Sequence, residues 1–412
     1  MNRVRSVWIC LFLLTAWCNN AAAQYNDYRY SRHINGITDT WHSITLPDEI
    51  FAKLQHDLPD MRIISVQQND TVEAPYLLKV LREQRHENPV SFRRINEART
   101  PEGYQYVLEL PEVQDVNEIE VFFNEVNFDR RVRVEFSQYV DRLWAAVPET
   151  FRIVSMKNND VEFQYSRLRF ATTKARFFRV TILNVADPKL TEARVTNVTI
   201  TEGTYRTYAA VDSIFNDKQN KQTVIDLKLR SPVPVSFVQL NVSSPFDYHR
   251  SIFFQAVVDS VKTQNGWEYS YRHMHGGSLS SLINEPFKFN NVVTSRLRIT
   301  IQNNDNRPLD FSGFVVKGNI HQLVARFDDP KPAYYLLYGN PNAANPQYDI
   351  HTFENRIPTD IKEATLGAET VRAKLAAQRR SPLFENKAWL WVAMGLVMLL
   401  LGVFTLRMMR TR

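Results

Sequence analysis

Cysteine is nearly absent from this 412-residue chain, and both copies lie in the first 23 residues. The chain after Cys10 and Cys18 therefore has neither disulfides nor thiolate metal sites. Glycine is also scarce, with 12 residues, and no glycine-rich phosphate-binding motif occurs. The sequence also lacks the H-E-x-x-H metal motif and the G-x-S-x-G nucleophile motif. We therefore expect no catalytic residue, no metal and no cofactor.

The beginning of the chain has the pattern of a secretory signal peptide over residues 1–23. Arg3 and Arg5 precede the apolar run Val7–Trp17, and three alanines end the segment. A lipoprotein alternative would place cleavage before Cys18, but Trp17 is too bulky for the small residue that such cleavage needs. Residues 24–40, which are rich in tyrosine, are expected to be a flexible lead-in.

The last long apolar stretch predicts a transmembrane helix over residues 388–406. Ala388–Leu406 carries no charge and would extend about 28 Å as a helix, close to the thickness of a bilayer core. Trp389 and Trp391 lie where an interfacial aromatic belt would lie. The arginines of residues 407–412 predict a cytoplasmic tail. We therefore expect a single-pass membrane protein with most of the chain on the side of the membrane away from the cytoplasm.

The net charge excludes one class of partner. The chain has a formal charge of +6, and five of its arginines lie in the two terminal segments just described. The segment between them is therefore close to neutral. A near-neutral domain lacks the basic surface that binding to phosphate backbones requires, so we expect no nucleic-acid partner.

Apolar and polar residues alternate in many short runs between Trp41 and Phe327, where helical periodicity is nearly absent. Val107–Leu110, Ile119–Phe123 and Val132–Phe136 are examples of half-buried strands. Many short strands separated by turns predict an all-β fold, either a sandwich or a barrel.

The strand pattern occurs twice in the sequence, as an internal repeat. Val107–Asn124 matches Val224–Asn241 in length and apolar positions, "NFD" at residue 127 matches "PFD" at residue 245, and "RVTILN" at residue 179 matches "RITIQN" at residue 298. We therefore predict tandem sandwich units at 101–204 and 222–355, the second with a closing strand, and a linker at 205–221. A β-rich segment at 41–100 would donate strands to the first unit, and helical composition predicts a juxtamembrane helix at 356–387.

Aromatic residues near the third strand of each unit are the candidate ligand contacts. Trp144 and Trp267 are either sugar-stacking platforms or packing residues of a hairpin, and the packing role is favoured. Tyr269 and Tyr271 lie beside Trp267 and are further candidate sugar contacts. His273 and His275 would share one face of a strand, but no third metal ligand lies nearby; they are therefore retained only as ligand contacts.

Two resemblances follow from these motifs. The repeated "R-V-x-I" strands with a tryptophan hairpin before them resemble tandem galactose-binding-like (discoidin-type) jelly rolls, which implies a scaffold role for the arginines and ligand binding at the loops of one end. The segments Trp41–Pro47, Asp57–Leu78 and Ala333–Ile350, followed by an apolar helix, resemble a bacterial exported, membrane-anchored family of unknown function. That resemblance implies a protein of the bacterial inner membrane, with most of the chain in the periplasm, and it implies no catalytic residues.

The expected function is therefore a noncatalytic, membrane-anchored binding or scaffold protein for an envelope glycan or an envelope protein. Two alternatives remain open. The first is an accessory subunit of a multi-span inner-membrane protein, which would act through the transmembrane helix and the segment Asp360–Arg380. The second is an envelope polysaccharide hydrolase, which needs two carboxylates facing each other across a cleft.

Overall fold

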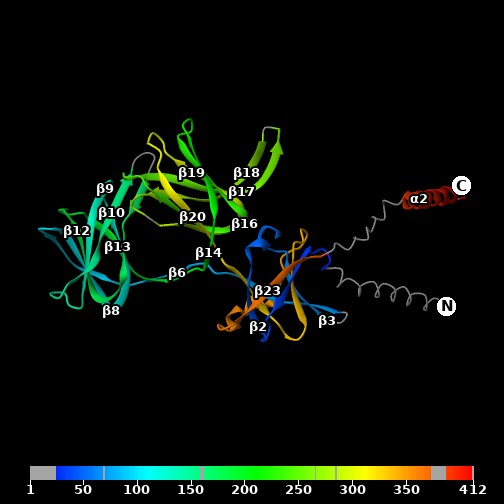
Figure 1. Ribbon diagram of the computed structural model, residues 1–412, viewed down its shortest axis with the longest axis horizontal. Coiled ribbons are helices and arrows are strands. Elements are labelled where there is room, and N and C mark those ends of the chain that lie inside the picture. Colours follow the sequence, from blue (N-terminus) through cyan, green and yellow to red (C-terminus); the bar gives the residue numbers. More distant parts are fainter. Residues whose placement is uncertain are drawn as a thin grey trace. The chain divides into compact units, whose positions relative to one another are not determined.

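A computed structural model describes residues 25–67, 70–157, 162–264, 266–283, 285–372 and 387–410 of the chain. The described chain is nearly all β-strand, which confirms the all-β prediction (Figure 1). The chain forms two compact units. The first holds the described residues up to His42, the segment Lys53–Tyr76 and the described residues from Ala325 onward. The second holds Ser43–Ala52 and Leu77–Val324.

An eight-stranded sheet belongs mainly to the first unit, with the strand order β4-β3-β22-β1-β23-β2-β21-β5. Its strands are β1 (Tyr30–Asn35), β2 (Trp41–Thr45), β3 (Met61–Gln67), β4 (Asp70–Ala74), β5 (Tyr76–Val80), β21 (His321–Arg326), β22 (Ala333–Tyr338) and β23 (Lys362–Val371). Strand β1 is antiparallel to both of its neighbours, so Tyr30 lies opposite Tyr338 on one side and Val371 on the other. In the described part of the chain, two 3-10 helices occur between strands, η1 (Asp48–Ile50) and η2 (Asp349–Arg356).

This sheet corrects three expectations about the ends of the chain. The segment expected to be a flexible lead-in contains β1, whose Ile34 is buried. The strand expected to close the second sandwich is β22, which pairs instead with β1 and β3. The predicted juxtamembrane helix contains β23.

The composition of β23 explains why it was mistaken for a helix. Its residues include several good helix formers, but Ala364 is buried and Leu366 is half-buried, the alternation of a strand. Strands β1 and β2 flank β23 and supply hydrogen-bond partners along both of its edges. Pairing and burial together outweigh the local preference for helix. Residues 373–386 of the same prediction lie outside the described residues.

The segment predicted to span a membrane does form a helix, α2 (Lys387–Met409). Within the residues that the structure describes, however, no helix has both the length and the apolar character needed to cross a membrane. The predicted transmembrane span is therefore not supported. The predicted signal peptide, residues 1–23, lies outside the described residues.

The first repeat of the second unit is a sheet with the order β11-β10-β9-β12-β8-β13-β6, in which β7 also pairs with β8. Its strands are β6 (Gln84–Pro89), β7 (Arg93–Thr100), β8 (Gly103–Phe123), β9 (Phe128–Ser137), β10 (Ala145–Lys157), β11 (Glu162–Tyr165), β12 (Arg167–Leu183) and β13 (Leu190–Thr201). Strands β6 and β7 come from the N-terminal β-rich segment. The two halves of β8 pair with opposite halves of β12, and their inward side chains meet in one core, so the sheet is sandwich-like.

The second repeat has the order β14-β20-β16-β19-β17-β18, in which β15 also pairs with β16. Its strands are β14 (Tyr205–Tyr208), β15 (Ala210–Asp217), β16 (Gln222–Val242), β17 (His249–Thr263), β18 (Gly266–Ser280), β19 (Phe287–Gln302) and β20 (Phe311–Asn319). The expected linker at 205–221 is therefore wrong, because it contains all of β14 and β15. These strands pair with β20 and β16 and so belong to the sheet.

The sequence repeat corresponds to a structural repeat. Strands β8 and β16, which carry the first matched segment, both have 21 residues. Each pairs with the strand that carries the matched arginine motif, β12 in the first repeat and β19 in the second. Leu110 and Leu227 occupy matching positions and are both fully buried, in two separate cores. The duplication therefore preserves the central strand pair and its inward-facing side chains.

Candidate functional site

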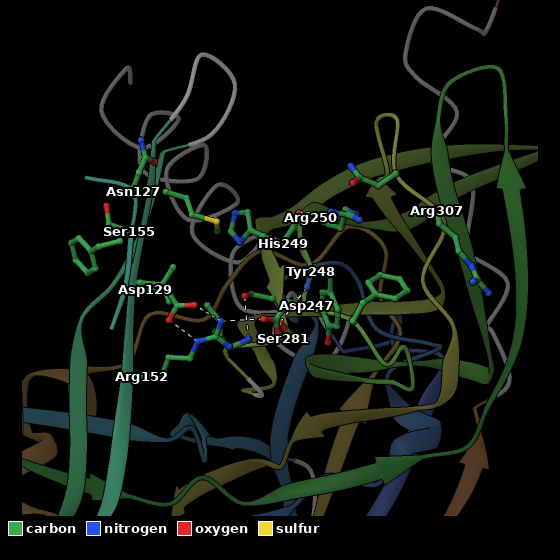
Figure 2. Close-up of a pocket in the computed structure, with 17 residues that line it drawn as sticks. Asn127, Asp129, Arg152, Ser155, Asp247, Tyr248, His249, Arg250, Ser281 and Arg307 are labelled. Carbon is green, nitrogen blue, oxygen red and sulfur yellow. Dashed lines mark hydrogen bonds and ion pairs between the residues drawn. The ribbon is translucent and has the colours of Figure 1, made fainter. Parts of the chain in front are cut away.

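A cavity of about 840 Å³ lies within the second unit, where the two repeats face each other (Figure 2). One wall comes from the start of β9 and the end of β10. The other comes from the segment that leads into β17, the turn after β18 and the loop between β19 and β20. Loops and strand ends at the edge of a sandwich lie on the surface and make few backbone hydrogen bonds to neighbouring strands. Their polar groups are therefore available to a ligand.

The matched "NFD" and "PFD" segments both line this cavity. Asn127 has a left-handed backbone, with φ of 61°, and its Oδ1 accepts a hydrogen bond from the Lys157 amide at 2.6 Å. Phe128 is buried against Phe123 in the core of the first repeat. The turn and the buried ring fix the backbone, so Asp129 projects from the start of β9 into the cavity.

Arg152 joins the aspartates of the two repeats, as Figure 2 shows. Its Nε and Nη2 donate to the two oxygens of Asp129 at 2.8 and 2.6 Å, and Nη2 also donates to Asp247 Oδ2 at 3.0 Å. The Ser281 hydroxyl donates to the other oxygen of Asp247 at 2.8 Å. This network holds the guanidinium in one orientation and leaves part of it exposed to the cavity.

The ion pairs determine the protonation of both aspartates. Hydrogen bonds from Arg152 hold the pKa of Asp129 below its usual value, although partial burial opposes the effect. Arg152 and the Ser281 hydroxyl likewise lower the pKa of Asp247. Both carboxylates are therefore ionised at neutral pH.

The opposite wall carries two groups whose bonding is incomplete. His249 lies against the Phe163 ring, with ring centres 4.3 Å apart, and its buried Nδ1 has no hydrogen-bond partner among the described residues. Burial and the Arg250 charge lower the pKa of His249, so its ring is neutral at pH 7. Arg250 donates through Nη1 to the His249 carbonyl at 2.9 Å, whereas its buried Nε has no described partner.

The aromatic residues predicted as ligand contacts lie elsewhere, on an outer surface of the second repeat. The rings of Tyr269 and Tyr271 cover the guanidinium groups of Arg296 and Arg298, at 4.3 and 4.2 Å from the ring centres. Trp267 is the second residue of the strand that carries both tyrosines, and it is 59 % exposed. The tyrosines thus pack on scaffold arginines, and a sugar-binding role for the three residues stays a prediction.

The two predicted histidines are separated by an irregularity in β18. Phe254 lies opposite His275, but the next residue of β17, Gln255, lies opposite His273, which marks a β-bulge. As a result His273 contacts Phe253, and His275 contacts Phe254 and stacks on Phe289. Because successive residues of β17 point to opposite faces, the histidines do as well, and the shared face expected from their spacing is absent.

Trp144 belongs to the first repeat, where its ring lies 4.3 Å from the Arg179 guanidinium. None of the six predicted residues lines the 840 Å³ cavity; His275 lines a smaller one of about 390 Å³. The residues of the larger cavity were missed because they are scattered in sequence. The one available signal was the matched aspartate of "NFD" and "PFD", which had served only to define the repeat.

No protein-family model matches the chain, and no curated protein matches it. Among solved structures, a truncated AlyQ with CBM32 and alginate lyase domains aligns with 62 % of this chain and 98 % of that one, at 8 % identity and a TM-score of 0.23. Two CBM32 domains of Clostridium perfringens ZmpB in complex with GalNAc align over 62 % and 92 %, at 7 % identity and a TM-score of 0.20. A fucolectin from striped bass (Morone saxatilis) serum aligns over 58 % and 97 %, at 12 % identity and a TM-score of 0.20. Similarity this low does not assign the chain to any of these families.

Proposed function

We propose that this chain is a noncatalytic binding protein that holds a glycan in the cavity between its two repeats. The observation that carries the proposal is that one arginine, fixed by the matching aspartates of both repeats, faces a cavity of suitable size. A volume of about 840 Å³ lies within the range of small-molecule sites and accommodates a short oligosaccharide.

The lining has the mixture of groups that sugars require. Phe246 and Tyr248 supply apolar surface for the C–H face of a ring, while Ser281 and Asn306 supply hydroxyl and amide groups. Arg152 and the two aspartates bring N–H donors and carboxylate acceptors together, which suits vicinal hydroxyls. We further propose that both repeats are galactose-binding-like modules, since the cavity lies at loop ends of each.

The charge state of the aspartates favours binding over hydrolysis. A glycosidase needs one carboxyl group that stays protonated at working pH, to act as general acid. Asp129 and Asp247 share one arginine, and both have lowered pKa values. Neither is suited to donate a proton, so we place the hydrolase hypothesis second.

The test begins with the full-length chain on a glycan array, followed by titration calorimetry with the best oligosaccharide. The Arg152→Gln variant is expected to bind about tenfold more weakly, a loss of about 1.4 kcal/mol, because the array of donors and acceptors loses its centre. Arg131→Gln is the matched control, since Arg131 lies opposite Arg152 on β9 and is exposed. Absence of any glycan ligand, or equal affinity of the wild type and Arg152→Gln, would contradict the proposal.

We also propose that the protein works in the periplasm of a bacterium. The lack of cysteine after Cys18 supports this, because such a chain cannot form wrong disulfides in an oxidising compartment. Protease added to intact spheroplasts should degrade the chain if the proposal holds. Protection that ends only on lysis would place the protein in the cytoplasm instead.

A further inference from the structure

The charges that line the cavity do not balance. Three arginines face it, Arg152, Arg250 and Arg307, against the two aspartates. Arg152 engages both carboxylates, and Arg307 lies 3.8 Å from Asp310 at the exposed rim. Arg250 remains as a cation with no ion-pair partner among the described residues.

The position of Arg250 is unusual for a cation. It lies on β17 two residues before Ile252 and four before Phe254, both fully buried. Since alternate residues of a strand share a face, Arg250 begins the row of side chains that points to the core. Its guanidinium therefore lies where the apolar core opens into the cavity, and burial lowers its pKa.

Arg250 has neither a counter-charge nor a full set of hydrogen bonds among the described residues, and an anion in the cavity would supply the counter-charge. One N–H donates to the His249 carbonyl, but the buried Nε has no described partner, and an unsatisfied buried donor is costly. A planar carboxylate accepts two parallel N–H bonds from a guanidinium, which matches the fork of Arg250.

We propose that this cavity selects an acidic glycan and that Arg250 binds the carboxylate of a uronic acid unit. This inference rests on the proposed function and adds the ligand class. A single unpaired guanidinium matches a singly charged carboxylate, whereas a phosphate dianion would require additional cations. A neutral sugar can accept a hydrogen bond from Arg250 through a hydroxyl oxygen, but it leaves the guanidinium without a counter-charge.

The experiment compares trisaccharides of glucuronate, galacturonate and mannuronate with their carboxyl-reduced neutral counterparts, by titration calorimetry on the full-length chain. At least one acid should bind tenfold or more tightly than its neutral counterpart, and the preference should shrink as salt rises. Arg250→Gln should bring the two affinities to within twofold, Arg250→Lys should retain part of the preference, and the control Arg131→Gln should retain all of it.

The outcomes separate this inference from the proposed function. If neutral trisaccharides bind as tightly as the acids, the acidic selectivity is wrong and glycan binding stands. If sulfated trisaccharides bind more tightly than uronates, the assignment of a carboxylate is wrong. If neither acids nor neutral sugars bind, both proposals fall. Should Arg250→Gln not fold, the wild-type comparison of acid with neutral sugar decides alone.

Discussion

The two repeats keep the same arginine but hold it in different ways. In the first, Arg179 on β12 binds the two oxygens of Glu135 on β9, at 2.7 and 2.8 Å. In the second, Arg298 on β19 binds both oxygens of Asp226, at 2.8 Å each, and Asp226 lies on β16. The arginine strand has a neighbour on each side in both repeats. The acidic partner lies on one of these neighbours in the first repeat and on the other neighbour in the second.

The aromatic cover of these arginines also differs between the repeats. Trp144 covers Arg179 from the connection before β10, whereas Tyr271 covers Arg298 from within β18. The comparison shows that duplication preserved the arginine on its strand, while the groups that neutralise and cover it were replaced. Matched aspartates at the cavity were also preserved, although they share a single arginine, Arg152.

Truncation of the matched core leucines is expected to have the largest effect. Leu110→Ala and Leu227→Ala should each lower the free energy of unfolding by about 2 to 5 kcal/mol, because each leaves a cavity in its own core. Chemical denaturation of the full-length chain measures both losses. A loss below about 1 kcal/mol at one position only would show that the repeats are not equivalent in their cores.

Removal of the carboxylate beside each arginine should have the next largest effect. Glu135→Gln and Asp226→Asn keep the side-chain shape but remove the charge that accepts two hydrogen bonds. Each should cost about 1.5 kcal/mol or more, because these side chains are mostly buried. A double-mutant cycle between Glu135 and Arg179 checks the interpretation, and coupling near zero would mean that the pair does not stabilise the fold.

The two tryptophans should differ in their contribution to stability. Trp144→Ala removes a ring that is half-buried on Arg179 and should cost about 1 kcal/mol. Trp267→Ala removes a mostly exposed ring and should change stability by less than about 0.5 kcal/mol. Thermal unfolding of the two variants makes this comparison. The reverse order would mean that Trp267 packs against something that Trp144 does not.

The smallest expected effect is a dependence of stability on acid pH. Because Arg152 lowers the folded pKa values of Asp129 and Asp247, their contribution is complete above the unfolded value of about 4 and is lost as the pH falls through the folded values. Solvent screens both side chains, so the change is small. Unfolding measured between pH 2 and pH 6 should show a flatter curve for Asp247→Asn than for the wild type. If the wild type and Asp247→Asn show the same dependence of unfolding on pH, Asp247 does not couple protonation to stability.

Local periodicity was enough to predict many strands of the two repeats, such as β8 and β9, but not β14 and β15, which lie in the expected linker. Alternation over Val107–Leu110 or Val132–Phe136 reports burial on one face, which is a local property. The partners of these strands depend on positions far away in sequence. For that reason β22 was assigned to the wrong sheet, and β23 was taken for a helix although β1 and β2 enclose it.

The candidate site was harder to predict than the fold. A bulge in β18 places the side chains of His273 and His275 on opposite faces of the sheet. The residue types at this position do not predict a bulge. Arg152 and Arg250 looked like two of many arginines on strands, because their roles depend on which groups lie across the cavity. Only the repeated aspartate of "NFD" and "PFD" carried information about the cavity.

The pairing of β1 with β22 also constrains when the protein can finish folding. Arg32 and Tyr338 share a hydrogen bond although they lie 306 residues apart, and the whole second unit is synthesised between them. Strand β1 leaves the ribosome early and has no permanent neighbour until translation is almost complete. Domains generally fold as units during synthesis. The second unit can therefore fold first, while β1 remains unpaired until β22 and β23 have been synthesised. A nascent chain of this kind exposes a strand edge for most of its synthesis, which makes it a natural client for a chaperone.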